Sequence, residues 1–198
     1  MNYILALIVG YLLGNVSASF IVGKLTKNID IRKFGSGNAG ATNTLRVLGV
    51  KAGILVFFVD ILKGVAAVLL GRFAAGDIGG MLAGAASVAG HIWPVFLSFK
   101  GGKGVATSFG VLVVLFPVVA LILFAVSASL VAITRFMSLG SIAAAVLLPI
   151  LLLIAGYDWL YIVFGLALAA LVVYLHKGNI TRLLAGKENK LGSKPKIK

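Results

Sequence analysis

The chain has 198 residues, of which 61% are hydrophobic and 12% are charged, and its mean hydropathy is +1.12. This composition excludes a soluble globular domain and indicates an integral membrane protein. The 18 basic residues against 5 acidic ones favour anionic partners, and the absence of cysteine excludes disulfides, thiolate nucleophiles and thiolate metal sites.

The first apolar run, 3–23, is long enough for a membrane-spanning helix, which needs roughly 20 apolar residues to cross a hydrocarbon core of about 30 Å. It is too long for the core of a signal peptide, and no basic region precedes it. We therefore expect the protein to retain this run as its first span.

The next segment contains GSGNAG, residues 35–40, which fits the dinucleotide-binding pattern G-x-G-x-x-G. That motif must follow a buried strand, whereas residues 24–34 are short and charged, so we exclude it. The glycines still allow successive main-chain N–H groups to converge on an anion. Residues 41–48 are predicted to form a short helix whose N-terminus points at the same place and which stops at Gly49.

Several polar side chains accompany this loop and could bind a phosphate. Neutral groups come from Ser36, Asn38, Thr42 and Asn43, and a guanidinium comes from Arg46. The alternative is a flexible loop with an ordinary helix cap.

The runs 52–75 and 78–98 each predict one helix. Within the first of them, Asp60 and Lys63 have i,i+3 spacing and are expected to neutralise each other in the bundle interior. A transporter would use such a pair in its pathway, so transport stays open as an alternative. His91 and Trp93-Pro94 are explained by an aromatic belt and a kink.

Residues 100–104, KGGKG, form a second loop suited to an anion, at the start of the next span. No Ser or Thr follows Lys103, so the loop is not a Walker A motif, and nucleotide binding is unsupported. The alternative is a turn whose lysines only mark the cytoplasmic side of the membrane.

The following apolar run, 105–134, would extend about 45 Å as one helix, which is too long without strong tilt. Pro117 lies near its middle and predicts a division into two short spans. The runs 139–156 and 159–175 predict the last two helices.

A third polar segment, 176–190, follows the last span. Asn179 and Arg182 have the same spacing as Asn43 and Arg46, which places an amide and a guanidinium on one face of a helical turn, where both could bind a phosphate. For His176, a structural hydrogen bond at the interface is the alternative to catalysis. Glu188 is expected to form a salt bridge within the site.

Basic residues orient the spans, because cytoplasmic loops are enriched in Lys and Arg. With seven spans, every basic residue except Lys63 and Arg72 falls on one face; with six spans, the basic C-terminal tail moves to the other face and this asymmetry collapses. We therefore predict an all-α integral membrane protein, a single domain over 1–198 with seven transmembrane helices. Its N-terminus is expected outside, and its C-terminus and motif-bearing loops in the cytoplasm.

Three stretches carry a resemblance to a known family: GSGNAGATNTLRVLG with Asp60 and Lys63-Gly64 after it, GHIWPVFLSFKGGKGVAT, and HKGNITRLLAGKENKLG. Together they resemble the cytoplasmic motifs of the bacterial membrane glycerol-3-phosphate acyltransferases that use acyl phosphate, and the likeness covers essentially the whole chain. It implies transfer of a fatty acyl group to the 1-hydroxyl of glycerol 3-phosphate, giving lysophosphatidic acid and phosphate, the first acylation of phospholipid synthesis. It also implies a multi-pass protein of the bacterial inner membrane.

The resemblance also implies roles for residues of all three stretches. Those expected in catalysis are Ser36, Lys103, His176 and Asn179. Those expected to bind acyl phosphate are Ser36, Gly37, Asn38, Gly40, Thr42, Asn43, Gly101, Gly102, Lys103 and Gly104. Those expected to bind glycerol 3-phosphate are Arg46, Ser141, His176, Asn179, Arg182, Glu188 and Lys190.

No Ser-His-Asp set is visible in the sequence, and neither His91 nor His176 has an aspartate five residues later. We expect direct attack by the glycerol hydroxyl on the acyl carbonyl, with Ser36 as a covalent nucleophile the alternative. No cofactor or metal is expected, because the few acids and histidines form no cluster with ligand spacing. Expected partners are the two substrates, membrane lipid and the soluble enzyme that supplies acyl phosphate, but no nucleic acid. A noncatalytic lipid-binding subunit is a further alternative.

Overall fold

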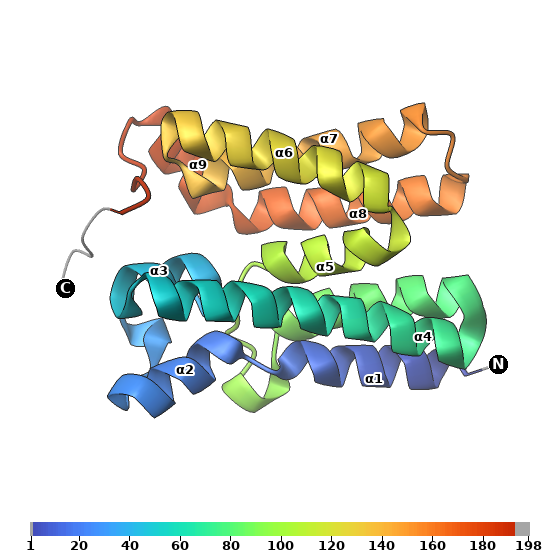
Figure 1. Ribbon diagram of the computed structural model, residues 1–198, viewed down its shortest axis with the longest axis horizontal. Helices are drawn as coiled ribbons and strands as arrows, with labels where there is room; N and C mark the ends of the chain where they lie inside the picture. Colours follow the sequence, from blue (N-terminus) through green and yellow to red (C-terminus); the bar gives the residue numbers. More distant parts are fainter. Residues whose placement is uncertain (1, 193–198) are drawn as a thin grey trace. The chain divides into compact units, whose positions relative to one another are not determined.

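The computed structural model describes residues 2–192, and these form helices joined by loops, without a β-strand among them (Figure 1). They belong to two compact units, one ending at Leu115 and the other beginning at Phe116. The fold is therefore all-helical, as predicted. The organisation as a single domain stays a prediction.

The first unit contains five α-helices and two short 3₁₀-helices. In chain order they are α1 (Tyr3–Asn15), α2 (Ala18–Lys27), η1 (Ile31–Lys33), α3 (Ala41–Leu48), α4 (Val50–Ile92), η2 (Val95–Leu97) and α5 (Val105–Leu115). The predicted short helix over 41–48 is confirmed, and it ends at Gly49, whose φ of 93° suits a glycine.

The first apolar run is not the single helix that we predicted for 3–23. Helix α1 ends at Asn15, and Val16 and Ser17 have extended backbone angles before α2 begins. Polar groups stabilise this break, because the Asn15 side-chain oxygen accepts a hydrogen bond from the Val95 N–H at 2.6 Å. Hydrophobicity alone could not show that a distant turn would interrupt the helix here.

Helix α4 reverses direction at its middle and so contains both runs that were predicted as separate helices. Ala75 and Gly76 have non-helical backbone angles, and Gly76 has a φ of 70°. The two passes then pack tightly, since a Cβ on Gly79 would lie 2.5 Å from the Gly71 oxygen. Figure 1 shows this turn in α4, with α1 beside the returning pass.

Two prolines end or begin helices in this part of the chain. The second pass of α4 ends at Ile92 rather than at 98, because Pro94 excludes the preceding residue from the helical region. Pro117 begins α6 and separates it from α5, as predicted.

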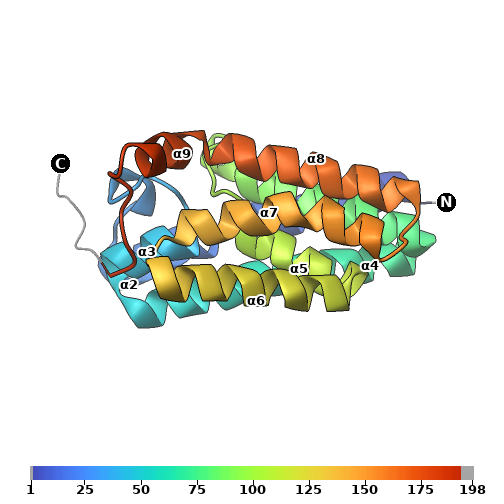
Figure 2. The same cartoon turned by 90° about the horizontal axis from the view of Figure 1, so that it is seen from above.

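The second unit consists of α6 (Pro117–Thr134), α7 (Met137–Ile154), α8 (Trp159–Leu175) and α9 (Lys177–Leu184). Helix α7 packs against both α6 and α8 (Figure 2). At one end of this unit, the buried Phe116 ring lies edge-on to the rings of Tyr157 and Tyr161, with centroids at 4.8 and 5.4 Å.

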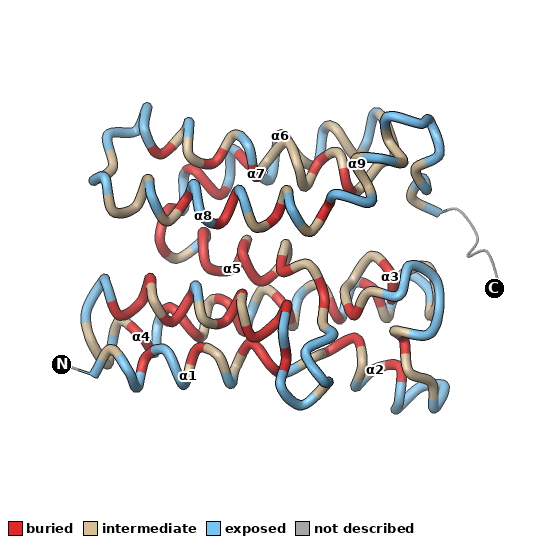
Figure 3. Tube along the Cα trace, turned by 180° about the vertical axis from the view of Figure 1, so that it is seen from behind, coloured by how far each residue is buried: buried red, intermediate tan, exposed pale blue. Residues whose placement is uncertain are grey.

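Large apolar side chains lie on the surface of both units, among them Leu25, Phe73 and Ile133, each more than four-fifths exposed. The buried residues form stripes along the helices, and exposed residues occupy the other faces (Figure 3). Four segments are long and apolar enough to cross a membrane: Tyr3–Lys27, Val50–Leu97, Pro117–Thr134 and Met137–Ile154. A fifth arises if α8 and α9, which meet at a 60° bend, form one span.

Candidate active site

The loop over residues 34–40 is organised around the side chain of Asn43. Its Nδ2 lies 3.0 Å from the oxygens of Phe34 and Asn38 and 3.2 Å from that of Ile31. Its Oδ1 accepts a hydrogen bond from the Ser36 N–H at 2.8 Å. These contacts differ from the expectation that Asn43 bonds a phosphate, because they commit the amide to holding the loop.

Other main-chain N–H groups, in this loop and at the start of α3, are available to bind an anion. The first helical hydrogen bond of α3 runs from the Thr44 N–H to the Gly40 oxygen, so the N–H of Thr42 has no partner within the helix. The N–H groups of Asn38 and Gly40 donate no hydrogen bond to residues 2–192. Gly40 precedes α3 and carries no capping side chain, which leaves this helix end suited to an anion.

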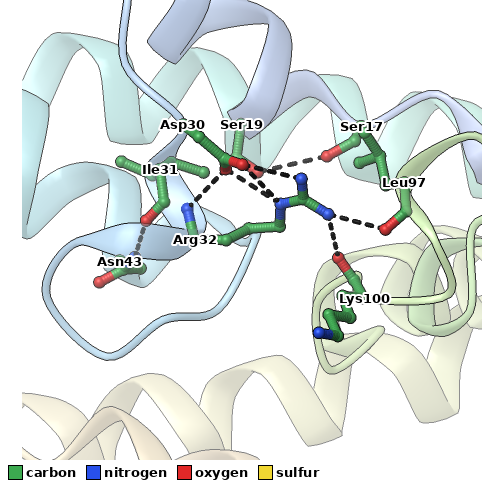
Figure 4. A network of polar contacts seen from close by, with 8 residues as sticks. All are labelled: Ser17, Ser19, Asp30, Ile31, Arg32, Asn43, Leu97 and Lys100. Carbon is green, nitrogen blue, oxygen red and sulfur yellow. Dashed lines mark hydrogen bonds and ion pairs between the residues drawn. The ribbon is translucent and has the colours of Figure 1, made fainter.

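Arg32 connects this loop to the segment before the second glycine loop (Figure 4). Its Nη1 donates to the Leu97 oxygen at 2.7 Å, and its Nε and Nη2 donate to the Asp30 carboxylate at 2.9 and 2.8 Å. This hydrogen bonding holds the pKa of Asp30 below its ordinary value and raises the pKa of Arg32. In the sequence, Arg32 is only one of the basic residues that orient the spans, because the position of the Leu97 oxygen depends on the fold.

The second glycine loop packs against the end of α4 and against the first loop. The Gly101 and Gly102 N–H groups donate to the oxygens of Ile92 and His91, both at 3.1 Å, and the Gly101 oxygen accepts from the Ala39 N–H at 3.4 Å. The two loops expected to bind phosphate therefore meet. We expected the amides of Gly101 and Gly102 to face an anion, but their hydrogen bonds to the end of α4 fix the loop instead.

Glycine is required in the second loop for two different reasons. Gly104 has a φ of 75°, which side chains other than glycine rarely adopt. A Cβ on Gly102 would collide with the His91 ring and lie 2.8 Å from the Ala39 oxygen. Between these glycines, Lys103 is partly buried.

Within the second unit, the third polar segment is organised around Glu188. Its Oε1 accepts hydrogen bonds from Asn179 at 2.6 Å and Ser138 at 2.9 Å, and its Oε2 accepts one from Arg182 at 2.8 Å. Burial raises the pKa of Glu188, but these three donors outweigh it, so the pKa lies below its ordinary value. The expected salt bridge of Glu188 is confirmed, with Arg182 as its partner.

His176 is buried between α8 and α9, and its ring nitrogens have distinct roles. The Nδ1 lies 2.8 Å from the Val172 oxygen, which can only accept a hydrogen bond, so Nδ1 carries the hydrogen. In the neutral ring, Nε2 is then the nitrogen with the lone pair.

The remaining predicted residues lie near these groups within their own units. Ser141 is one turn into α7 and donates to the Met137 oxygen at 2.9 Å, and the Lys190 ammonium lies over the Phe136 ring. Ser36 is exposed, and its hydroxyl forms no hydrogen bond to a base within residues 2–192. Arg46 is partly buried on α3. The same described range contains no group of three His, Asp or Glu side chains suited to a metal.

The predicted pair of Asp60 and Lys63 forms in the interior of the first unit, with 2.8 Å between Nζ and Oδ1. His91 is buried beside it and is not part of an aromatic belt, so our interpretation of His91 was wrong. No spacing in the sequence connected His91 with Lys63, because the turn at Ala75–Gly76 brings the two passes of α4 together.

Comparison with known proteins gives a family and a fold. Residues 4–186 match the family model described as glycerol-3-phosphate acyltransferase. The chain is 50% identical to a glycerol-3-phosphate acyltransferase of Thermoanaerobacter sp. (strain X514) and 46% identical to one of Alkaliphilus metalliredigens, covering 100% of both chains in each pair.

Two solved structures are similar to the whole chain. They are crystal structures of PlsY (YgiH), an integral membrane glycerol 3-phosphate acyltransferase, in its glycerol 3-phosphate form and its lysophosphatidic acid form. Their TM-scores are 0.91 and 0.88 at 42% and 41% identity, over 97% of this chain and 96% of each of those chains. With the full-length relatives and the family model in agreement, this chain belongs to the glycerol-3-phosphate acyltransferase family.

Proposed function

We propose that this protein transfers a fatty acyl group from acyl phosphate to the 1-hydroxyl of glycerol 3-phosphate, releasing lysophosphatidic acid and inorganic phosphate. Membership of the family supports the acceptor and the product. The observation that carries the proposal for the donor is the meeting of two glycine loops at Ala39 and Gly101, because it gathers uncapped amides and Lys103 in one place.

The first unit binds the phosphate of the donor in this proposal. Ser36, Thr42 and Lys103 supply hydroxyl and ammonium groups, and the amides of Asn38 and Gly40 complete the site. Gly37, Gly101, Gly102 and Gly104 shape the loops, while Asn43 holds the first of them. The anion gains both the hydrogen bonds and the positive end of the α3 dipole.

Glycerol 3-phosphate is bound by cations and by the neutral groups around Glu188. We assign Arg182 and Lys190 to its phosphate, and Ser141, His176 and Asn179 to its hydroxyls. Glu188 positions Asn179 and Arg182, since its carboxylate accepts a hydrogen bond from each of them.

The transfer proceeds by direct attack. The oxygen of the 1-hydroxyl forms the new ester bond to the acyl carbon, and the bond from that carbon to the phosphate oxygen breaks. The hydroxyl proton passes to an oxygen of a substrate phosphate. Acyl phosphate is an activated mixed anhydride, so holding two anions side by side supplies much of the acceleration. Within residues 2–192 the exposed Ser36 hydroxyl forms no hydrogen bond to a base that could activate it as a nucleophile, which supports this route.

We further propose seven transmembrane spans, the N-terminus outside, and an active site on the cytoplasmic face of the bacterial inner membrane. The reversal in α4 and the break at Pro117 support this number. Helix α5 has only 11 residues, or about 16 Å, and is the shortest of the proposed spans. Single cysteines at 76 and 49 in this cysteine-free chain, labelled in intact cells, test the topology: residue 76 should react from outside and residue 49 should not.

A purified sample given acyl phosphate and glycerol 3-phosphate tests the reaction. We expect lysophosphatidic acid and phosphate in equal amounts, and a folded sample without product contradicts the proposal. Incubation with labelled acyl phosphate alone separates the two routes, because a Ser36-linked acyl group that transfers on addition of acceptor would exclude direct attack. Acyl phosphate that a soluble enzyme makes in the same assay is expected to sustain the reaction as well as added acyl phosphate does.

A further inference from the structure

Asp60, Lys63 and His91 form a buried polar network in the first unit. The first two lie on the outgoing pass of α4 and the third on its returning pass. Their side chains are 2%, 5% and 6% exposed. Charged groups at such depth in a membrane protein are costly and are generally kept for a purpose.

Lys63 is the centre of this network. Its Nζ lies 2.8 Å from Asp60 Oδ1, 2.9 Å from the Val16 oxygen and 2.7 Å from His91 Nδ1. The contact with Val16 is a hydrogen bond that the ammonium donates, and the contact with Asp60 is an ion pair, because Oδ1 accepts no hydrogen bond within residues 2–192. The Val16 oxygen belongs to the break between α1 and α2, so the network also satisfies a carbonyl that the interrupted helix leaves without a partner.

The two distances to His91 Nδ1 decide the state of its ring. Lys63 Nζ is at 2.7 Å and Asp60 Oδ1 is at 3.5 Å. With Lys63 as an ammonium, which can only donate, Nδ1 accepts the shorter contact and carries no hydrogen. The hydrogen of the neutral imidazole is then on Nε2, and the ring is held in one orientation.

The opposite edge of the same ring lies against the second glycine loop. Nε2 occupies the space that a Cβ at Gly102 would need. The main chain of His91 and Ile92 also contacts this loop, because their oxygens accept the N–H groups of Gly102 and Gly101 at 3.1 Å. The position of the loop, and with it that of Lys103, therefore depends on how the network holds this end of α4.

We propose that Asp60, Lys63 and His91 are positioning residues for the loop 100–104, and that the network keeps Lys103 where it binds the donor. This inference rests on the proposed assignment of Lys103 to the phosphate of acyl phosphate. Because all three side chains are almost fully buried, the proposal gives them no contact with a substrate.

Two variants test the proposal. His91→Asn keeps an oxygen near the position of Nδ1 for Lys63 but removes the ring edge at Gly102. The double variant Asp60→Asn, Lys63→Met removes the ion pair without leaving a lone buried charge, an exchange that proteins often tolerate. Asp77→Asn, which breaks the exposed pair of Asp77 with Arg72, is the matched control for loss of a carboxylate.

The measurement is the KM of each substrate and kcat for protein shown to be folded by its melting temperature. We expect both variants to raise the KM of acyl phosphate, or lower kcat, by on the order of 10-fold to 100-fold, the scale of a displacement near 1 Å. The KM of glycerol 3-phosphate should stay within about twofold, and Asp77→Asn should match the unsubstituted protein.

The outcomes separate this inference from the proposed function. Lys103→Ala is the reference: if it leaves the KM of acyl phosphate and kcat unchanged, the assignment of Lys103 fails. If Lys103→Ala impairs the enzyme but folded His91→Asn and the double variant retain normal constants, the positioning role is overturned. If His91→Asn does not fold, the KM of acyl phosphate and the kcat of the double variant decide between these outcomes.

Discussion

The guanidinium of Arg32 lies 2.7 Å from the main-chain oxygen of Leu97, so one side chain ties the first loop to the segment that leads into the second. Asp30 holds the other side of the same guanidinium. A hydrogen bond to a carbonyl fixes a main-chain position rather than the end of a flexible side chain, which makes Arg32 a determinant of loop geometry.

Replacing Arg32 should therefore impair activity without unfolding the protein. Charge-assisted hydrogen bonds contribute about 1.5–3 kcal/mol each, and partial exposure places Arg32→Ala at the lower end, near a tenfold loss of kcat/KM. Arg32→Lys should recover only part of the lost kcat/KM, since an ammonium lacks the planar set of N–H donors of a guanidinium. Lys33→Ala, its exposed neighbour, serves as the control; equal losses in both variants would mean that only charge matters.

Gly102→Ala should remove most of the activity. Its Cβ would collide with the His91 ring and the Ala39 oxygen, so the second loop must shift. Gly178→Ala is the control, because the nearest atom to its Cβ is Arg182 Nη1 at 3.5 Å, an ordinary contact. Initial rates at saturating substrate compare the two, and a fully active Gly102→Ala would show that the loop does not need its present position.

Glu188→Gln should weaken the acceptor site. The substituted amide can still accept from one or two donors, but its NH₂ group would face another donor among Asn179, Ser138 and Arg182. With a loss of about 1.5–3 kcal/mol, we expect roughly a 10-fold to 150-fold decrease in kcat/KM for glycerol 3-phosphate. Lys187→Gln, an exposed substitution of similar size, should leave this kcat/KM nearly unchanged. Equal values for the two variants would contradict the proposal that Glu188 positions Asn179 and Arg182.

Acid should destabilise both loop systems. The pKa values of Asp30 and Glu188 are lower in the folded protein than in the unfolded chain, so the unfolded chain binds more protons as the pH falls. The stabilisation is complete above the ordinary carboxyl range and is lost as the pH drops from about 5 through the folded pKa values. Melting temperatures in detergent should fall over this window, less steeply for a variant with Asp30→Asn and Glu188→Gln. Identical profiles of melting temperature against pH for this variant and the unsubstituted protein would contradict the assignment of the acid effect to Asp30 and Glu188.

Gly10→Ala and Gly14→Ala should lower the melting temperature. Alanine normally stabilises a helix interior by roughly 0.5–1 kcal/mol relative to glycine. Here each Cβ would press on main-chain oxygens of α4, at Ala83 and Ser87, so the sign should reverse. Gly178→Ala, within α9, should show the ordinary small gain, and a gain at all three positions would mean that α1 and α4 can separate at little cost.

The amino-acid sequence by itself determined the helical membrane class, the short helix at 41–48, the break at Pro117 and the pairing of Asp60 with Lys63. These features depend on hydrophobicity, on proline and glycine, and on spacing within one helix, all of which are local. The resemblance carried by the three motifs likewise needed only the order of residues, and it led to the family that the comparisons show.

Only the tertiary structure decided what the polar groups bond to. Asn43 and Glu188 appeared as separate polar residues in the sequence, yet each collects donors or acceptors from several segments. The break after Asn15, the bond from Arg32 to Leu97 and the contact of Lys63 with His91 join residues 28 to 80 positions apart. Such contacts depend on the reversal of α4 and on the turn at Pro94, and no periodicity within a single helix records them.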